Sequence, residues 1–309
     1  MPSIDAGARS DGVWPALPPA GWRDTYATLH LWTQIVGKTR LALAPMENHW
    51  WQAALYVTSR GLTTSPMPSR GVAISVDFDF LDHRLHIRTS DGAERALPLA
   101  PQSVADFYAA YGETLRALGH DVRIRPVPVE VERAIPFAED REHAAYDPDA
   151  AHRWWRALVR ADLVMKTFRG AFLGKSSPVH FWWGAFDLAT TRFSGRPAPR
   201  YAGRVPNCPD YVMVEAYSHE CSSCGFWPGG DLLPEPAFYA YAYPEPAGYR
   251  DRFPGVPAAY YHPDLSEFIL PYEAVPTAAE PDKTVLTFFQ SAYEAAADLG
   301  RWDRAALER

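Results

Sequence analysis

The order of secondary structure that the sequence predicts occurs twice along the chain, and this repetition constrains the fold more than any other feature. Residues 24–43 carry apolar side chains at helical spacing, residues 72–80 alternate them as a strand does, and residues 103–118 are helical again. Pro148 then opens a second series of helix and strands, which closes with a helix over residues 282–299. The sequence therefore predicts an α+β fold made of two modules of helix, antiparallel strands and helix.

Local patterns place the remaining elements. Ser103 is suited to be the N-cap of its helix and Gly119 to end it. Aromatic and β-branched residues predict a strand over residues 50–59. The strands expected in the second half cover residues 179–191, 212–217, 238–243 and 268–270.

Direct alignment of the two halves supports an internal duplication. A shift of 132 positions (182 minus 50) places Trp50 and Trp51 on Trp182 and Trp183, and it aligns Arg60 with Arg192. A shift of 181 (300 minus 119) aligns the two closing helices. Such repeats usually pack as one unit, with their sheets either facing or extending one another.

This organisation divides the chain into three parts. We expect an N-terminal arm over residues 1–21, whose Trp14 and Leu17 dock on the body, a first module over residues 22–131 and a second over residues 132–309. The second module contains the longer loops, rich in Pro, Gly and Tyr. Long irregular loops in a compact domain are more often functional than idle, so we look for function in the second half.

Charge and composition limit the partners. The net charge of -7 gives no attraction to phosphate backbones, so nucleic acid is disfavoured. No apolar stretch approaches the roughly 20 residues that span a bilayer, and the first residues lack the pattern of a signal peptide, so we expect a cytoplasmic protein without membrane contact. The 11 Trp, 16 Tyr and 15 Phe predict an aromatic-rich core or an aromatic-lined site.

The cysteines cluster in the second half and suit a reducing compartment. His219, Cys221 and Cys224 have the ligand types that zinc prefers. Only Cys208, His180 or His262 could complete a four-ligand site, and two buried thiols are the plainer reading.

Polar residues near the second set of strands are candidates for catalysis, namely His180, Arg192, His219 and Glu220. If residues 179–191 form one strand, alternation puts His180 and Arg192 on one face and Asp187 on the other. The alternative is structural, with His180 in a buried polar network and Arg192 paired with a carboxylate. Trp182, Phe226 and Trp227 are candidates for substrate binding, and the loop 225–230 either covers a pocket or pins itself to the core.

Several blocks of sequence carry a resemblance to a known family. They are Trp-Thr-Gln-Ile-Val-Gly-Lys at 32–38, Asn-His-Trp-Trp at 48–51, the segment 56–66, Ala-Tyr-Ser-His-Glu at 216–220 and Gly-Phe-Trp-Pro-Gly at 225–229. From Trp14 onward the chain resembles a bacterial family of domains of unknown function. The resemblance implies no activity, cofactor or substrate, and Cys221 and Cys224 are not part of its pattern.

Three functions remain open at this stage. The first is a small-molecule pocket, for binding or catalysis, between the two halves. The second is a non-enzymatic interaction or assembly protein that self-associates through aromatic and Pro-rich surfaces. The third is a metal-dependent enzyme using the cysteine cluster. Phosphate-loop, dinucleotide, zincin and serine-hydrolase motifs are all absent from the sequence, so these four functions lose their usual sequence evidence and the cofactor is unknown.

Overall fold

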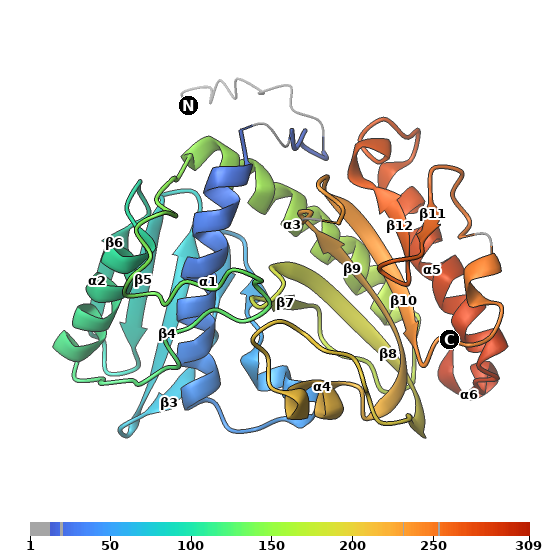
Figure 1. The fold of residues 1–309 in the computed structure, drawn as a ribbon, viewed down its shortest axis with the longest axis horizontal. Helices are drawn as coiled ribbons and strands as arrows, with labels where there is room; N and C mark the ends of the chain where they lie inside the picture. The colour runs from blue at the N-terminus through green and yellow to red at the C-terminus, as the bar shows by residue number, and fades with distance from the viewer. Residues whose placement is uncertain (1–12, 19–20, 231, 253) are drawn as a thin grey trace, which may run out of the picture.

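Two antiparallel sheets flanked by helices form the fold, which is α+β as predicted (Figure 1). The computed structural model describes residues 13–18, 21–230, 232–252 and 254–309.

The first half contains one sheet with helices α1 (Arg23–Leu43) and α2 (Val104–Ala117). Its strands are β1 (Tyr56–Val57), β2 (Gly61–Thr63), β3 (Met67–Ser69), β4 (Val72–Asp79), β5 (Arg84–Thr89) and β6 (Glu94–Pro98). They are ordered β1-β2-β4-β5-β6, and β3 pairs with β4. The predicted caps of α2 are confirmed, because the Ser103 side chain accepts a hydrogen bond from the backbone of Asp106 and Gly119 has a φ of 85°.

The second half contains the other sheet, in the order β11-β12-β10-β9-β8-β7. Its strands are β7 (His180–Trp182), β8 (Asp187–Pro197), β9 (His219–Trp227), β10 (Ala237–Tyr243), β11 (Tyr260–His262) and β12 (Glu267–Pro271). Its helices are α3 (Pro148–Gly170), α4 (Asp210–Ala216), α5 (Pro281–Leu299) and α6 (Arg304–Leu307). Short 3-10 turns lie at η2 (Tyr249–Asp251) and η3 (Tyr272–Ala274).

Helix α1 is surrounded by protein, since every residue from 28 to 40 is buried. On one side Trp32 stacks on Phe107 of α2, with ring centroids 4.7 Å apart. On another side Gly37 lies against Trp183, so closely that a Cβ at position 37 would overlap the indole ring. The helix thus contacts both halves of the molecule.

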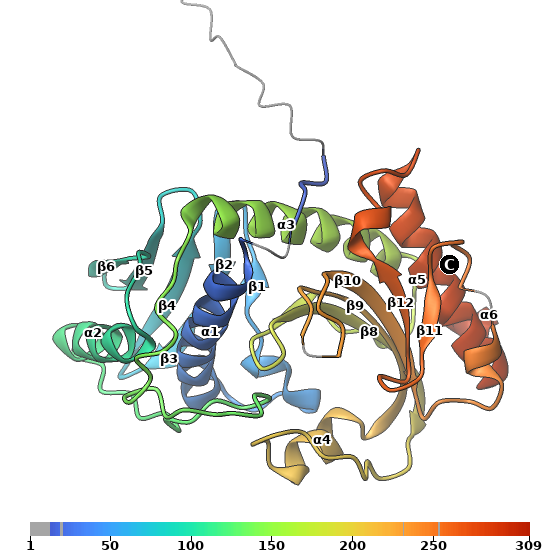
Figure 2. The ribbon, with the colours of Figure 1, turned by 45° about the horizontal axis from the view of Figure 1, so that its top comes forward.

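The two sheets extend one another at a narrow seam. Leu55, just before β1, and Phe181 of β7 exchange backbone hydrogen bonds of 2.9 and 2.8 Å. Helix α3 runs along both halves and packs on α1, β8 and α5 (Figure 2). Of the two arrangements left open by the sequence, the structure shows the sheets edge to edge.

A segment near the N-terminus is fixed to the C-terminal helix. The indole Nε1 of Trp14 donates to Asp282 Oδ1 at 2.8 Å, and the Tyr272 hydroxyl donates to the carbonyl of Pro15 at 2.7 Å. Trp14 is buried, and Leu17 packs on the same core. The expected docking of these two residues is confirmed, while residues 1–12 and 19–20 of the expected arm lie outside the described residues.

Two predicted strands are wrong. Residues 212–216 belong to α4, where Asp210 stabilises the first turn, and Tyr217 caps its end. In the other predicted strand, residues 50–59, the first residues belong to the 3-10 turn η1 (Asn48–Ala53), and only the short β1 is a strand. There His49 donates its backbone N–H to Glu215 and Trp50 its indole N–H to Val212, so contacts with α4 override the local preference for a strand.

The duplication stays a prediction. Each half has a helix before and after an antiparallel sheet, and the closing helices α2 and α5 match the alignment. The aligned Trp50 and Trp182, however, lie in a 3-10 turn and a strand respectively. No helix among the described residues has the length and apolar character that crossing a membrane requires.

Candidate functional site

The second sheet carries polar residues on the face opposite α3 and α5. Those two helices pack on the face that bears Leu188, Phe226 and Phe238. In Figure 2, α5 and α4 lie on opposite sides of this sheet. Following the strand register, the face away from α5 collects His180, Trp182, Asp187, Ser223, Trp227, Tyr239, Tyr241 and Glu267.

Asp187 lies on this face because the chain reverses just before it. The sequence predicted one strand over residues 179–191, which would place Asp187 opposite His180. Instead, residues 183–186 form a turn with Phe186 at a φ of 61°, and Trp182 pairs directly with Asp187 across β7 and β8. The turn shifts the alternation, so Asp187 joins His180 and Trp182, while Arg192 lies on the helix-covered face. The predicted arrangement of faces is therefore wrong.

Asp187 is bonded to a tyrosine that lies across the sheet. The Tyr239 hydroxyl donates to Asp187 Oδ2. Gly225, between them in the register, makes this possible: a Cβ there would lie 2.5 Å from the Tyr239 Cε1 and nearer still to its Cζ and hydroxyl. The bare backbone at position 225 therefore gives the ring the space to reach the carboxyl group.

Three carboxyl groups, those of Asp187, Glu267 and Glu130, stay protonated to a higher pH than is usual for such groups. Burial raises the pKa of Asp187 to about 6, against the lowering effect of the Tyr239 hydrogen bond. Burial and then the charge of Asp187 raise the pKa of Glu267 to about 8 and that of Glu130 to about 7. Glu130 is exposed to solvent as a residue, and its carboxyl group lies against Gly184. All three groups therefore exchange protons near neutral pH.

Helix α1 faces this region with a buried polar stripe of residues four positions apart, His30, Gln34 and Lys38. His30 Nε2 lies 2.8 Å from the carbonyl oxygen of Gly184, to which it donates. Gln34 makes two hydrogen bonds with the backbone of Val129, one donated at 2.8 Å and one accepted at 2.9 Å. The stripe thus fixes the turn before β8 and the segment that carries Glu130.

Glu130 is held in place by its backbone. Its N–H donates to the carbonyl of Pro206 at 2.7 Å, and Asn207 donates to the carbonyl of Val131 at 2.8 Å. Glu130 and Asn207 both have positive φ, 58° and 55°, a conformation that costs about 1 kcal/mol or more for such residues. A Cβ at Gly184 would lie 2.7 Å from Glu130 Cδ, so the carboxyl group rests on this glycine.

Lys38 brings an amine to the same place. The Lys38 residue is 5% exposed to solvent, and its Nζ lies 5.5 Å from the centroid of the Trp183 ring. Burial and then Arg125 lower the pKa of this amine to about 8, while Cys208 and Glu130 act in the opposite direction. Burial also raises the pKa of the Cys208 thiol to about 11. We refer to Lys38, Glu130, Asp187, Tyr239 and Glu267 as the inter-half site.

Two of the predicted residues, Trp182 and Trp227, lie half-buried on the same face. Trp227 donates its indole N–H to the carbonyl of Ala185 at 3.2 Å. His180 also faces this way but is fully buried among Trp51, Tyr56 and Trp182. Neither of its nitrogens has a hydrogen-bond partner among the described residues, and burial lowers the pKa of its imidazole to about 3. His180 is therefore a neutral side chain behind the tryptophans.

Arg192 is part of the core between the sheet and two helices. Its guanidinium donates to the carbonyl of Phe168 and lies 3.5 Å from the centroid of that ring and 4.3 Å from that of Tyr293. Burial lowers its pKa to about 10. The structure thus separates Arg192 from the site. Its surroundings differ from those of the aligned Arg60, which lies at the surface and pairs with Asp79 at 2.5 Å.

His219 and Glu220 lie at the start of β9, away from Asp187. Glu220 pairs with Arg196 at 2.6 Å and also accepts from Ser194 at 2.9 Å. His219 packs edge-on against His49 with ring centroids 5.6 Å apart. Glu220 is therefore bound in a structural ion pair.

The two cysteines that were candidates for metal binding with His219 point to opposite sides of β9. Cys221 pairs with Phe193 and Cys224 with Thr190, three positions apart. Burial raises the pKa of both thiols, that of Cys221 to about 12. No group of three His, Cys, Asp or Glu side chains suited to a metal ion occurs in the described part of the chain. Phe226, a candidate for substrate binding, packs instead on Phe238 and Tyr272 in the core beneath α5.

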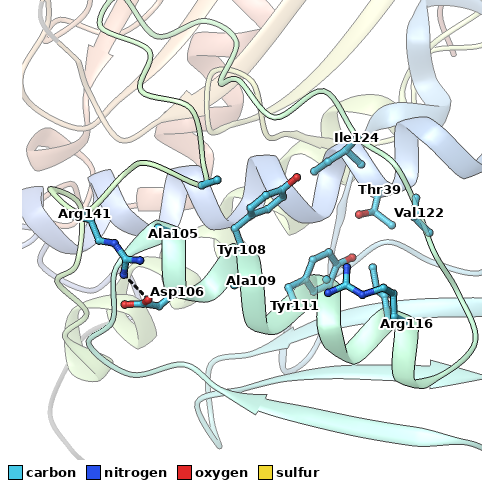
Figure 3. Close-up of a pocket in the computed structure, with 13 residues that line it drawn as sticks. Thr39, Ala105, Asp106, Tyr108, Ala109, Tyr111, Arg116, Val122, Ile124 and Arg141 are labelled. Carbon is cyan, nitrogen blue, oxygen red and sulfur yellow. Dashed lines mark hydrogen bonds and ion pairs between the residues drawn. The ribbon is translucent and has the colours of Figure 1, made fainter.

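Two hollows lie elsewhere. One of about 360 Å³ lies between α1, α2 and the linker after α2, where Arg141 and Asp106 pair with each other (Figure 3). The other, of about 440 Å³, lies beside Trp51 at the end of α3, with Arg169, Lys175 and Arg309 around it. Neither contains a member of the inter-half site.

Sequence reasoning missed most of the inter-half site. Tyr239 and Tyr241 alternate along a predicted strand and mark one face, which is a usable signal. Glu130 lies in a segment with no periodic pattern, and Lys38 shares its helix with Arg23 and Arg40, so neither residue has a signature of its own in the sequence.

A family model described as a family of unknown function, DUF5996, matches residues 14–309. No curated protein and no solved structure matches the chain.

Proposed function

The chain belongs to the DUF5996 family, whose function is unknown, and we propose that this protein binds a small organic molecule at the inter-half site and exchanges protons with it. The observation that carries the proposal is Asp187, whose carboxyl group accepts a hydrogen bond from Tyr239 across Gly225 and whose charge raises the pKa values of Glu130 and Glu267. A general acid or base works best when its pKa lies near the working pH, and these carboxyl groups meet that condition.

The surroundings favour a small organic ligand over a macromolecule or a metal ion. Trp182, Trp227 and Tyr241 are half-buried beside the carboxyl groups, and such rings bind the apolar faces of small molecules. Tyr241 shares a hydrogen bond of 2.8 Å with Tyr217, which adds hydroxyl groups that can donate or accept. Partly accessible polar groups between two halves are typical of ligand sites.

The inter-half site combines features that destabilise the fold, and this also indicates that the site has a function. A largely buried lysine side chain without a hydrogen-bond partner and residues of positive φ destabilise a fold. Here Lys38, Glu130 and Asn207 combine these features in one region. Such concentrations are common at functional sites.

The test is native mass spectrometry of the purified chain before and after denaturation, followed by a ligand screen by thermal shift. We expect a retained small molecule, or a stabilising compound, whose binding falls at least about tenfold in both Asp187→Asn and Tyr239→Phe. The first change removes the carboxyl group that exchanges protons, and the second removes the donor of the hydrogen bond to it.

Glu220→Gln is the matched control, since Glu220 lies on the same sheet but pairs with Arg196 away from Asp187. It should bind as the wild type does. Equal binding by wild type and Asp187→Asn would overturn the proposal, as would a chain that binds nothing in the screen. The same spectra report the oligomeric state, so they also test the predicted self-association.

A further inference from the structure

Lys38 differs from the other lysines of this chain. The sequence contains four, and three of them have a polar partner: Lys166 pairs with Asp162 at 2.6 Å, Lys283 with Glu280 at 2.8 Å, and Lys175 contacts His49 Nε2 at 2.7 Å. Lys38 makes no hydrogen bond or ion pair within the described ranges, although it is 5% exposed. The lysine side chain is thus largely buried, and its amine lies over the Trp183 ring instead of against a polar partner.

The position of this amine is fixed by packing. Residues 28–40 of α1 are buried on all sides, and Gly37, one residue before Lys38, is in contact with Trp183. The Lys38 Nζ lies over the same ring. Gln34, one helical turn earlier, holds Val129 and so sets the backbone of the adjacent Glu130. The amine and a carboxyl group are therefore presented from two anchored elements.

We propose that Lys38 is a nucleophile that forms an imine with the carbonyl carbon of a small uncharged aldehyde or ketone bound at the inter-half site. This inference rests on the proposed function, because it needs a small molecule at that site. The carboxyl groups of Glu130, Asp187 and Glu267 disfavour anionic carbonyl compounds such as keto acids.

The reaction balances without an oxidant or reductant. The nitrogen lone pair of the neutral amine attacks the carbonyl carbon, and the oxygen takes up a proton to give a carbinolamine. Protonation of that hydroxyl, by Glu130 in its acid form, releases water and leaves the iminium of Lys38, which loses a proton to give the imine.

The state of the neighbouring groups fits this chemistry. Lowering of the Lys38 pKa to about 8 leaves roughly a tenth of the amine neutral at pH 7, where an ordinary lysine has almost none. Glu130, with a pKa of about 7, is present in both forms there. The Cys208 thiol stays protonated and is a poor competitor for the carbonyl.

The experiment is reductive trapping of the full chain with acetaldehyde and sodium cyanoborohydride, read by peptide mapping of each lysine. We expect ethylation of Lys38 at least about tenfold faster than of Lys166 or Lys283, with a rate that rises with pH to a plateau above pH 8. Glu130→Gln should slow Lys38 about tenfold and leave the other lysines unchanged. Glyoxylate, an anionic aldehyde, should trap poorly.

The three paired lysines are internal controls in the wild-type chain, so the result does not depend on a variant that folds. Trapping of Lys38 no faster than of Lys283 overturns the inference. If native mass spectrometry still shows a retained small molecule in that case, the proposed function stands and only the imine falls. If no molecule is retained and nothing is trapped, both fall.

Discussion

Replacing Gly225 by alanine tests the geometry on which the inter-half site depends. The new Cβ would lie 2.5 Å from Cε1 of the Tyr239 ring and closer to its Cζ and hydroxyl, so the ring has to move away from the sheet. Overpacking of this kind costs about 1 to 3 kcal/mol. Loss of the hydrogen bond to Asp187 costs about 1.5 to 3 kcal/mol more, although the two effects overlap.

We therefore expect Gly225→Ala to lower the free energy of unfolding by about 3 kcal/mol. Urea unfolding followed by tryptophan fluorescence measures this loss. Gly170→Ala is the matched control, because nothing lies within 4 Å of a Cβ at the end of α3. It should change the stability by less than about 0.5 kcal/mol.

Measuring Gly225→Ala in a chain that also carries Tyr239→Ala shows whether the Tyr239 ring causes the loss of stability. In Tyr239→Ala the ring that Gly225 accommodates is gone, so the added methyl group meets open space and should cost little. A loss of the same size in both backgrounds would refute the reasoning, because the penalty would then come from the strand itself.

Three further changes follow from burial and charge. Lys38→Met should raise the free energy of unfolding at pH 7 by about 1 to 3 kcal/mol, because it removes a largely buried side chain whose amine pKa burial lowers to about 8. A loss of stability in urea unfolding would show that Lys38 is a structural residue. The pKa of Asp187 is about 6 in the folded state against an ordinary value of 3.8, so between these pH values the folded state binds more protons than the unfolded state. As the pH rises from about 4 to about 6, the free energy of unfolding of the wild type should therefore fall by about 2 kcal/mol relative to that of Asp187→Asn. A constant difference between the two across that range would contradict this assignment. Arg192→Met should cost about 3 kcal/mol, since it removes the guanidinium that donates to the Phe168 carbonyl and leaves that oxygen only the 3.4 Å hydrogen bond from the Ala171 backbone. A neutral result would show that the aromatic rings around Arg192 suffice.

The elements that the sequence predicted well are those whose shape follows from local patterns. Helices α2, α3 and α5 each have an apolar stripe and a clear start, and β4 alternates over its whole length. Residues 212–217 misled the prediction because valine and tyrosine favour strands, whereas the position after Pro209 and the contacts with η1 favour a helix.

The site was less predictable because it depends on relations between distant segments. One four-residue turn decided on which face Asp187 lies, and alternation carried through that turn gave the wrong answer. Lys38 was hidden for a different reason. A helix buried on all sides has no polar face, so a polar stripe along it has no contrast in the sequence.

The attachment of Trp14 to α5 has a consequence for synthesis. The segment around Trp14 leaves the ribosome long before its hydrogen-bond partner Asp282, which lies 268 positions later. The sheet of the first half can pair in the meantime, because all its strands lie within residues 56–98. The two segments are therefore joined only after Asp282 has been released, and burial of the Trp14 indole reports that this late step of folding is complete.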